Sequence, residues 1–337
     1  MTDYVGENAD RLVTIELRSS SFPRDVIRPL HEASLRQLGE SSISGAAARA
    51  LRERIGPGDV VFILTGSGYP PAMPKGENDG PPGGAHLAHA LFRGLGAVPV
   101  FVCEARHVDP IVASSQAAGL MIHPFEHAKG VGLGASIAAI PDGADVDTWI
   151  TDVLDEYDPK AIISIEKVGP GENGHLHGIT GQPATDGGAM WGFTDISGLV
   201  TQARERGVLS IGVGDGGNEI GFANLSEEVA AVAPHGAAIC CTVGVDILFP
   251  ATCSNWGAYA IEAVLAADLG RPELMHTPQM EQRVLQACLD AGGVEAVDCS
   301  TKFLLDGFSG TASMALVELL GELVRKSVEA PYRGPAH

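Results

Sequence analysis

Acidic side chains follow several apolar stretches of this sequence, at positions where they could act together. They are Glu77, Asp79, Glu166, Asp215 and Glu219. Carboxylates repel one another, so a group that converges needs a cation, a shared proton or a basic group of a substrate. Ligands of open α/β sheets gather beyond the carboxyl ends of the strands. If the apolar stretches are strands of one sheet, these acids therefore mark a candidate site.

The segment GVGDGGNEIG (212–221) is the richest of these positions. Gly212, Gly214 and Gly217 satisfy G-x-G-x-x-G, yet Asp215 lies where a pyrophosphate would sit, and the motif comes late in the chain. No Gly-Lys-Ser/Thr sequence of a P-loop follows any glycine run. We therefore expect no nucleotide cofactor. A structural turn explains the glycines but not Asp-Gly-Gly-Asn-Glu as a set, which favours a metal or substrate site.

Two further segments combine helix-start signals with polar groups. In ENDGPPGG (77–84) the prolines predict a helix start, and the backbone N–H groups of Gly83 and Gly84 could hold a carboxylate or phosphate. Asp79 could equally be a plain N-cap of that helix. In SNWGAYA (254–260) Asn255 also stands at a helix start, where capping is the structural alternative to a binding role.

Basic and imidazole side chains near these segments leave alternatives open. Lys75 is a scarce cation that could bind a substrate carboxylate or could balance local acids, and the same holds for Lys167. His86 and His89 share a helical face, where a surface or interface role is favoured over metal binding. The loop GHLHG (174–178) offers two histidines as mobile general acids or bases.

The elements that must position these residues alternate between helix and strand. Continuous apolar runs with β-branched residues, such as VVFILT (60–65), are typical of strands buried on both faces. The alternation predicts a three-layer α/β fold, with a mostly parallel sheet and helices on both faces. We expect one domain over 1–337, with 130–145 as the place of a sub-domain boundary if there is one. Helices are predicted over 24–38, 43–55, 84–94, 109–118, 146–157, 196–206, 254–269, 278–291 and 309–325, and strands over 60–65, 98–103, 120–123, 161–165, 208–213 and 238–243.

Charge and composition narrow the classes of partner. The formal net charge of −20 argues against nucleic acid and anionic membranes, which need clustered Lys and Arg. An acidic substrate would have to be held by backbone N–H groups, a metal ion or a few selected cations. No apolar run approaches the roughly 20 residues of a membrane span, the N-terminus lacks a secretory signal, and the six cysteines contain no C-x-x-C pair. We expect a cytoplasmic protein that binds a small acidic molecule, and a homo-oligomer stays open.

Four of the segments together resemble one family. ENDGPPGG, IEKVGP, GVGDGGNEIG and SNWGAYA occur in the order and at the spacing of the C-terminal cyclase-type domain of the D-glutamate cyclase family. The resemblance runs from about 51 to 270. The vertebrate members carry an additional N-terminal domain, so the chain resembles a stand-alone, bacterial-type member.

The resemblance implies a lyase that closes a small acidic amino acid into a ring. The α-amine of D-glutamate attacks its own γ-carboxyl group, water leaves, and 5-oxo-D-proline forms. Oxygen ligands favour Mg²⁺ or Mn²⁺ over Zn²⁺, so a divalent cation of this kind is the expected cofactor. The implied metal ligands are Asp79, Glu166, Asp215 and Glu219. The implied catalytic residues are Glu166, Asp215 and Glu219. We expect the substrate-binding residues to be Lys75, Gly83, Gly84, Gly216, Gly217, Asn218 and Asn255.

The segment between Glu166 and Thr194 departs from the family pattern, because it is longer and differently composed. If this loop covers the substrate, the substrate can differ from D-glutamate. Two other functions compete with the cyclase: a Mg²⁺- or Mn²⁺-dependent phosphohydrolase of a small phosphate ester, and a non-catalytic amino-acid-binding protein.

Overall fold

A six-stranded, fully parallel sheet forms the centre of the protein, with the strand order β3-β2-β1-β4-β7-β8. The computed structural model describes residues 2–17, 24–68, 70–181, 183, 185–186, 189–190 and 194–329. The strands of the sheet are β1 (Val60–Leu64), β2 (Val98–Glu104), β3 (Ser136–Ile140), β4 (Ala161–Ile165), β7 (Leu209–Gly214) and β8 (Ile247–Pro250). Two short antiparallel pairs join β5 (Thr185–Asp186) to β6 (Ala189–Met190) and β9 (Leu304–Leu305) to β10 (Phe308–Ser309).

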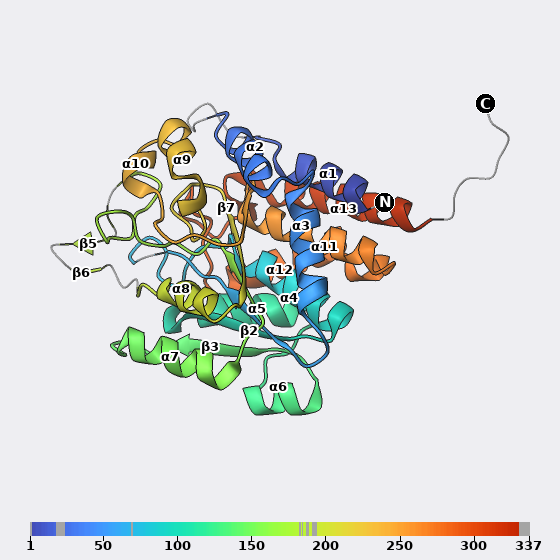
Figure 1. Cartoon of the computed structure of the whole chain (residues 1–337), viewed down its shortest axis with the longest axis horizontal. Helices are drawn as coiled ribbons and strands as arrows, with labels where there is room; N and C mark the ends of the chain where they lie inside the picture. Colours follow the sequence, from blue (N-terminus) through green and yellow to red (C-terminus); the bar gives the residue numbers. More distant parts are fainter. Residues whose placement is uncertain are drawn as a thin grey trace.

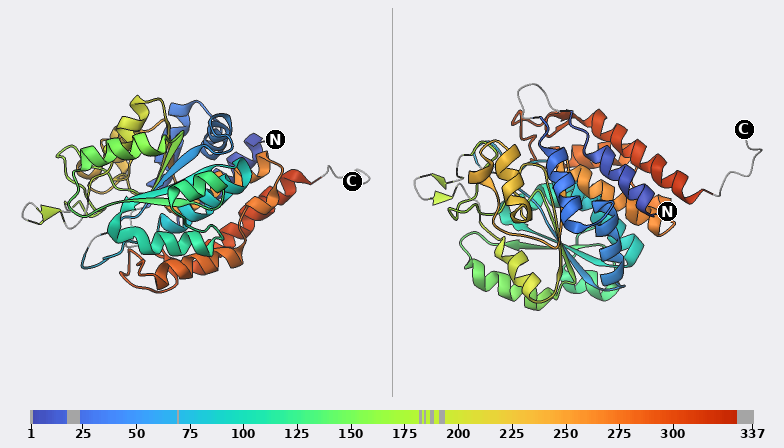
Figure 2. Two further views of the ribbon diagram at one scale, coloured as in Figure 1. Left: turned by 90° about the horizontal axis from the view of Figure 1, so that it is seen from below. Right: turned by 45° about the horizontal axis from the view of Figure 1, so that its top comes forward.

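Helices cover both faces of the sheet (Figure 1, Figure 2). One face carries α1 (Thr2–Val13), α3 (Ile43–Arg54), α4 (Pro81–Leu95), α5 (Val108–Ala117), α11 (Ser254–Asp268), α12 (Pro278–Asp290) and α13 (Gly310–Val328). The other carries α2 (Ile27–Leu38), α6 (Phe125–Val131), α7 (Val146–Tyr157), α8 (Gly198–Glu205) and α9 (Ser226–Val232). The helices α1 and α13, at opposite ends of the sequence, lie side by side (Figure 1). The predicted three-layer α/β fold is confirmed.

The strands are buried on both sides, which explains their unbroken apolar sequences. Along β1, Val61 and Ile63 pack into the core on the α4 and α11 side, whereas Val60, Phe62 and Leu64 pack into the core on the α7 and α8 side. Both sets are almost completely inaccessible to solvent. Side chains alternate across a strand, so a strand covered on both faces needs apolar residues at every position.

The strand order reverses its direction of growth between β1 and β4. From β1 the chain proceeds outward through β2 to β3, and then returns to β4 and proceeds outward through β7 to β8. The carboxyl ends of the two central strands diverge into loops at such a switch point, which is where open α/β sheets bind ligands. The fold therefore directs attention to the loops after β1, β4 and β7.

The prediction of a strand over 238–243 is wrong. The first residues of this range belong to the short helix α10 (Gly236–Ile239). The strand at this edge of the sheet is β8, whose sequence ILFP ends in proline. Edge strands tolerate proline because one of their sides needs no backbone partner. Cys240 and Cys241 instead pack into the core on the α7 and α8 side of the sheet. The Cys241 N–H donates to the Gly217 carbonyl at 3.0 Å. The segment 120–123 forms only a single bridge between Ile122 and Ala135.

Other features bear on the sequence predictions. The range 130–145 contains β3, which pairs with β2 in the main sheet. Part of the loop 169–193 lies outside the described residues, namely 182, 184, 187–188 and 191–193. Short 3₁₀ helices are η1 (Ala105–His107), η2 (Ala223–Leu225) and η3 (Pro272–Leu274). Within the described ranges, no helix combines the length and the apolar character needed to cross a lipid bilayer.

Candidate active site

An acidic cavity of about 390 Å³ lies at the switch point of the sheet. Its walls come from the loops after β1, β4 and β7 and from the turn between β9 and β10. Among the described residues no Lys or Arg lines the cavity, and its carboxylates are those of Glu77, Glu166, Asp215 and Asp306. Four carboxyl groups that converge without a basic side chain among the described lining residues favour a cation or a positively charged group of a substrate.

Glu166 stands at the centre of this arrangement, directly after β4. Its backbone adopts the left-handed conformation with φ of 54°, which is uncommon outside glycine and typical of functional sites. The Ser254 hydroxyl donates to the Glu166 carboxylate at 2.5 Å. Burial, and then the neighbouring Glu219 and Asp215, raise the pKa of Glu166 well above its usual value. A carboxyl group with a raised pKa is suited to accept a proton and return it.

The loop after β7 is built around Glu219. This carboxylate accepts hydrogen bonds from the backbone N–H groups of Asp215, Gly216 and Gly217 at 2.8–2.9 Å. Gly217 has φ of 105°, and a side chain there would meet Val229 at 2.6 Å, so glycine is required. The motif therefore folds its own loop as well as supplying acids.

Three of the four predicted metal ligands come together. Glu166, Asp215 and Glu219 each offer a carboxylate oxygen, and these oxygens lie within 4.8 Å of one another. Glu166 and Asp215 line the cavity, whereas Glu219 does not. The oxygen-rich donor set is of the kind that holds Mg²⁺ or Mn²⁺.

Asp79, the fourth predicted ligand, does not line the cavity. Its carboxylate accepts from the backbone N–H groups of Ser254 and Asn255 at 2.9 and 2.8 Å, at the start of α11. A carboxylate there is stabilised by the free N–H groups and the dipole of the helix. Burial, and then the charge of Asp306, nevertheless raise the pKa of Asp79 to about 7. Asp79 thus anchors the helix that carries Ser254, and Ser254 contacts Glu166.

The raised pKa of Asp79 predicts how stability depends on pH. Because the folded state holds this proton more tightly than the unfolded chain, the contribution of Asp79 to the free energy of unfolding is greatest below about pH 4 and declines toward pH 7. We expect the difference in unfolding free energy between wild type and Asp79→Asn to shrink by up to about 4 kcal/mol over that range. Urea titrations of both proteins at several pH values measure it, and a difference that grows with pH would contradict the assignment.

The predicted substrate-binding groups of the α4 segment are already engaged within the protein. The Asn255 side-chain oxygen accepts from the N–H groups of Gly80 and Gly83 at 2.9 and 2.6 Å, and the Gly84 N–H donates to the Gly80 carbonyl. The Asn255 amide also donates to the Asn78 carbonyl at 3.0 Å. Asn255, Gly83 and Gly84 therefore lock the start of α4 against the start of α11. The N–H groups of Gly216 and Gly217 are similarly engaged by Glu219.

The two lysines are not brought to the cavity. Lys75 pairs with Asp109 at 2.7 Å near the surface. Lys167 is buried against Glu104, and its ammonium donates to the Gly66 carbonyl at 2.8 Å. Of the other predicted binding residues, Asn218 lines the cavity, and its amide donates to the His177 carbonyl at 2.8 Å.

Several residues of the cavity were not among the predicted site residues. Asp306 lies in the turn between β9 and β10, where Asp-Gly between Leu305 and Phe308 is a hairpin signal in the sequence. Ser254 does not line the cavity but donates to Glu166, and it was not among the predicted site residues either. His177, one of the two loop histidines, lines the cavity, is buried, and has an Nδ1 atom without a hydrogen-bond partner among the described residues. Its Nε2 lies 3.0 Å from the Asn173 side-chain oxygen.

Comparison with known proteins agrees with this picture. The family model described as "D-glutamate cyclase-like, C-terminal" matches residues 25–321. The human protein named "D-glutamate cyclase, mitochondrial" is 28% identical over 212 residues, which are 60% of this chain and 32% of the human protein. The chain thus covers about a third of the length of that relative. The matched region contains every residue of the acidic cavity except Leu17, and the chain belongs to the D-glutamate cyclase-like C-terminal family.

Proposed function

We propose that the protein is a D-glutamate cyclase-like lyase that dehydrates a small acidic amino acid to a cyclic lactam. For D-glutamate, a bond forms between the amine nitrogen and the γ-carboxyl carbon, a carbon–oxygen bond breaks, and one water leaves. The observation that carries the proposal is the group of acids around Glu166 at the switch point of a chain of this family.

Glu166 is the group best suited to activate the amine. A substrate ammonium fits the negative cavity, and it must lose a proton before its nitrogen can attack. The Glu166 carboxylate lines the cavity that would hold the ammonium, and the Ser254 hydroxyl fixes its position, so it is placed to take that proton. His177 faces the same cavity and is the candidate to protonate the departing oxygen.

A divalent cation would supply the positive charge that the carboxylates of an acidic substrate need in this cavity. The carboxylates of an acidic substrate would be repelled by Glu77, Glu166 and Asp215, and no Lys or Arg among the described residues faces them. Glu166 and Asp215, with Glu219 behind them, offer the hard oxygen atoms that would hold Mg²⁺ or Mn²⁺. When bound, such an ion polarises a carboxyl group and stabilises negative charge on its oxygens.

The experiment that tests this function is a substrate panel. Purified protein with Mn²⁺ is incubated with D-glutamate, L-glutamate and related acidic amino acids, and the loss of primary amine is followed. Loss of amine with formation of the lactam supports the proposal. Release of phosphate from a panel of phosphate esters, or calorimetric binding of an amino acid without turnover, would replace it with one of the two competing functions.

Removal of divalent cations is expected to abolish most of the activity. Dialysis against EDTA should lower the rate, and added Mn²⁺ or Mg²⁺ should restore it, because the substrate carboxylates then regain a positive partner. The same ions should raise the melting temperature of wild type more than that of Asp215→Asn. An unchanged rate in metal-free protein would remove the cation from the proposal.

A further inference from the structure

A second group of metal-ligating side chains lies buried away from the acidic cavity. His86 belongs to α4, His276 precedes α12, and Glu281 lies in the first turn of α12. The exposed fractions of these three residues are 2%, 9% and 0%. None of them lines the acidic cavity. The surface or interface role predicted for His86 is wrong, because this side chain is buried.

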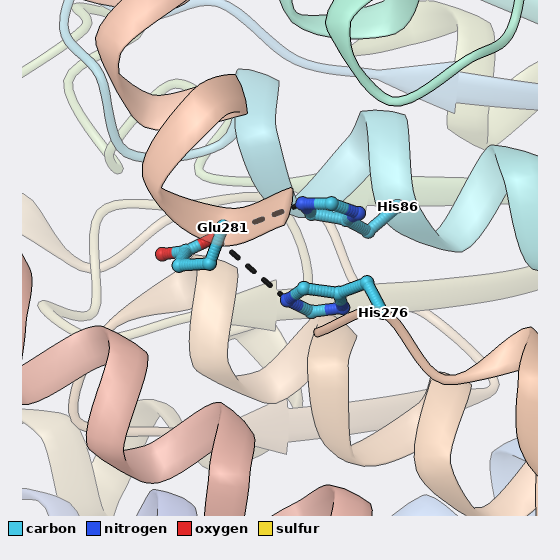
Figure 3. A group of neighbouring side chains, drawn as sticks. All are labelled: His86, His276 and Glu281. Carbon is cyan, nitrogen blue, oxygen red and sulfur yellow. Dashed lines mark ion pairs between the residues drawn. The ribbon is translucent and has the colours of Figure 1, made fainter. Parts of the chain in front are cut away.

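Both imidazoles direct the same atom at one carboxylate oxygen (Figure 3). The Nε2 atoms of His86 and His276 lie 3.7 and 3.8 Å from Glu281 Oε2. Neither Nε2 has a hydrogen-bond partner among the described residues. Buried polar atoms are rarely left without a partner, because the loss of hydration is then uncompensated. Two such atoms directed at one carboxylate oxygen are the arrangement expected of side chains that share a ligand such as a cation.

The surrounding hydrogen bonds fix the orientation of these ligands. His276 Nδ1 lies 2.7 Å from the carboxylate of Glu262 on α11. The Tyr259 hydroxyl donates to Glu281 Oε2 at 2.8 Å, and the Ser313 hydroxyl donates to Oε1 at 2.6 Å. A histidine that donates one ring N–H to a carboxylate and keeps the other nitrogen for a ligand is the usual arrangement around protein-bound metals.

Charge also favours a divalent cation here. Glu262 and Glu281 are both fully buried, and among the described residues no Lys or Arg forms an ion pair with either. A buried carboxylate needs either a compensating positive charge or a bound proton. One divalent cation with two neutral imidazoles would balance the two negative charges, and no proton would need to be trapped.

We propose that His86, His276 and Glu281 form a buried binding site for Zn²⁺. Two imidazole nitrogens and one carboxylate oxygen are a donor set suited to zinc and related first-row ions, in contrast to the all-oxygen set of the acidic cavity. The Tyr259 hydroxyl, which donates to Glu281 Oε2, would orient this carboxylate toward the ion. The two rings stack with centroids 3.6 Å apart, so binding of a common ion would require them to rotate about χ2, a soft torsion in histidine.

The zinc site would be structural. It would join α4, α11 and α12, the helices around these side chains. At the starts of α4 and α11, Asn255 accepts from the Gly83 N–H and Ser254 donates to Glu166. An ion bound one or more turns along these helices would therefore help to hold these contacts in place. The inference does not depend on the proposed reaction.

Metal analysis of the full-length protein tests the site. Protein purified without metal-affinity chromatography, and dialysed first against Zn²⁺ and then against metal-free buffer, should retain about one zinc per chain by mass spectrometry. His86→Gln and Glu281→Gln should each lower that content at least about tenfold. His89→Gln, three residues away on the same helix, and Asp215→Asn in the acidic cavity should leave it unchanged.

A second measurement keeps the test decisive if the ligand variants fail to fold. Replacement of zinc by Co²⁺ in the wild type should give visible absorption bands typical of a site with nitrogen ligands, and Tyr259→Phe should shift them. A wild type that retains no ion after Zn²⁺ loading, or ions retained equally by His86→Gln, would overturn the proposal. Loss of zinc in Asp215→Asn alone would also overturn it, by placing the ion in the acidic cavity.

Discussion

Replacement of Glu166 by glutamine is expected to lower kcat for lactam formation by about 10²- to 10⁴-fold, the range typical of a lost general acid–base group. Glutamine has nearly the same shape, and its side-chain oxygen can still accept the Ser254 hydrogen bond seen at 2.5 Å. It cannot take a proton from an ammonium at neutral pH. Removal of a buried carboxylate that is surrounded by other acids should also leave the fold intact or slightly stabilise it.

Steady-state kinetics with thermal unfolding of the same samples measures this effect. Glu227→Gln, an exposed acid in the first turn of α9, is the matched control and should retain full activity. A Glu166→Gln protein with wild-type kcat would exclude Glu166 as the proton acceptor. A variant that loses activity only in proportion to its melting temperature would indicate a structural role instead.

The largest loss of stability is expected from Asn255→Ala. The Asn255 side chain satisfies the N–H groups of Gly80 and Gly83 and the Asn78 carbonyl, all buried. Each buried polar group left without a partner costs about 1–3 kcal/mol, so the free energy of unfolding should fall by about 3–5 kcal/mol. The start of α4 would then separate from the start of α11, and activity should fall as well, because Ser254 and Asp79 depend on the same contact.

Chemical denaturation monitored by circular dichroism measures this change. Asn8→Ala, which removes a single hydrogen bond to the Tyr4 carbonyl within α1, is the matched control and should change stability by less than about 0.5 kcal/mol. If Asn255→Ala is as stable as the control but binds substrate poorly, Asn255 is a ligand-binding residue, as the family resemblance implied, rather than a structural one.

The layered fold could be predicted from the sequence, because strands buried on both faces are apolar at nearly every position. Runs such as AIISI (161–165) are apolar at every position, and β4 forms there with the predicted bounds. The acids that follow β4 and β7 could be expected near one another, since the ends of parallel strands share one edge of the sheet. By contrast, β8 is short, lies at the edge and ends in Pro250, so it carries little strand signal.

The roles of individual groups could not be read from the sequence, because long-range hydrogen bonds decide them. The N–H of Gly83 appears available at a helix start until Asn255, distant in sequence, occupies it. Lys75 is close to the acids in sequence, yet it pairs with Asp109. His86 and Glu281 are separated by most of the chain and meet only because α4 and α12 pack together. Local patterns contain no information on such contacts.

The most direct test of the central claim is an NMR time course of ¹³C-labelled D-glutamate with wild type and Glu166→Gln in the presence of Mn²⁺ held at a low concentration. We expect the wild type to convert the label to 5-oxo-D-proline, and the variant to do so at least about 10²-fold more slowly. Conversion at equal rates by both proteins would contradict the role of the acidic cavity. A wild type that leaves D-glutamate and the other acidic amino acids unchanged would contradict the proposed reaction itself.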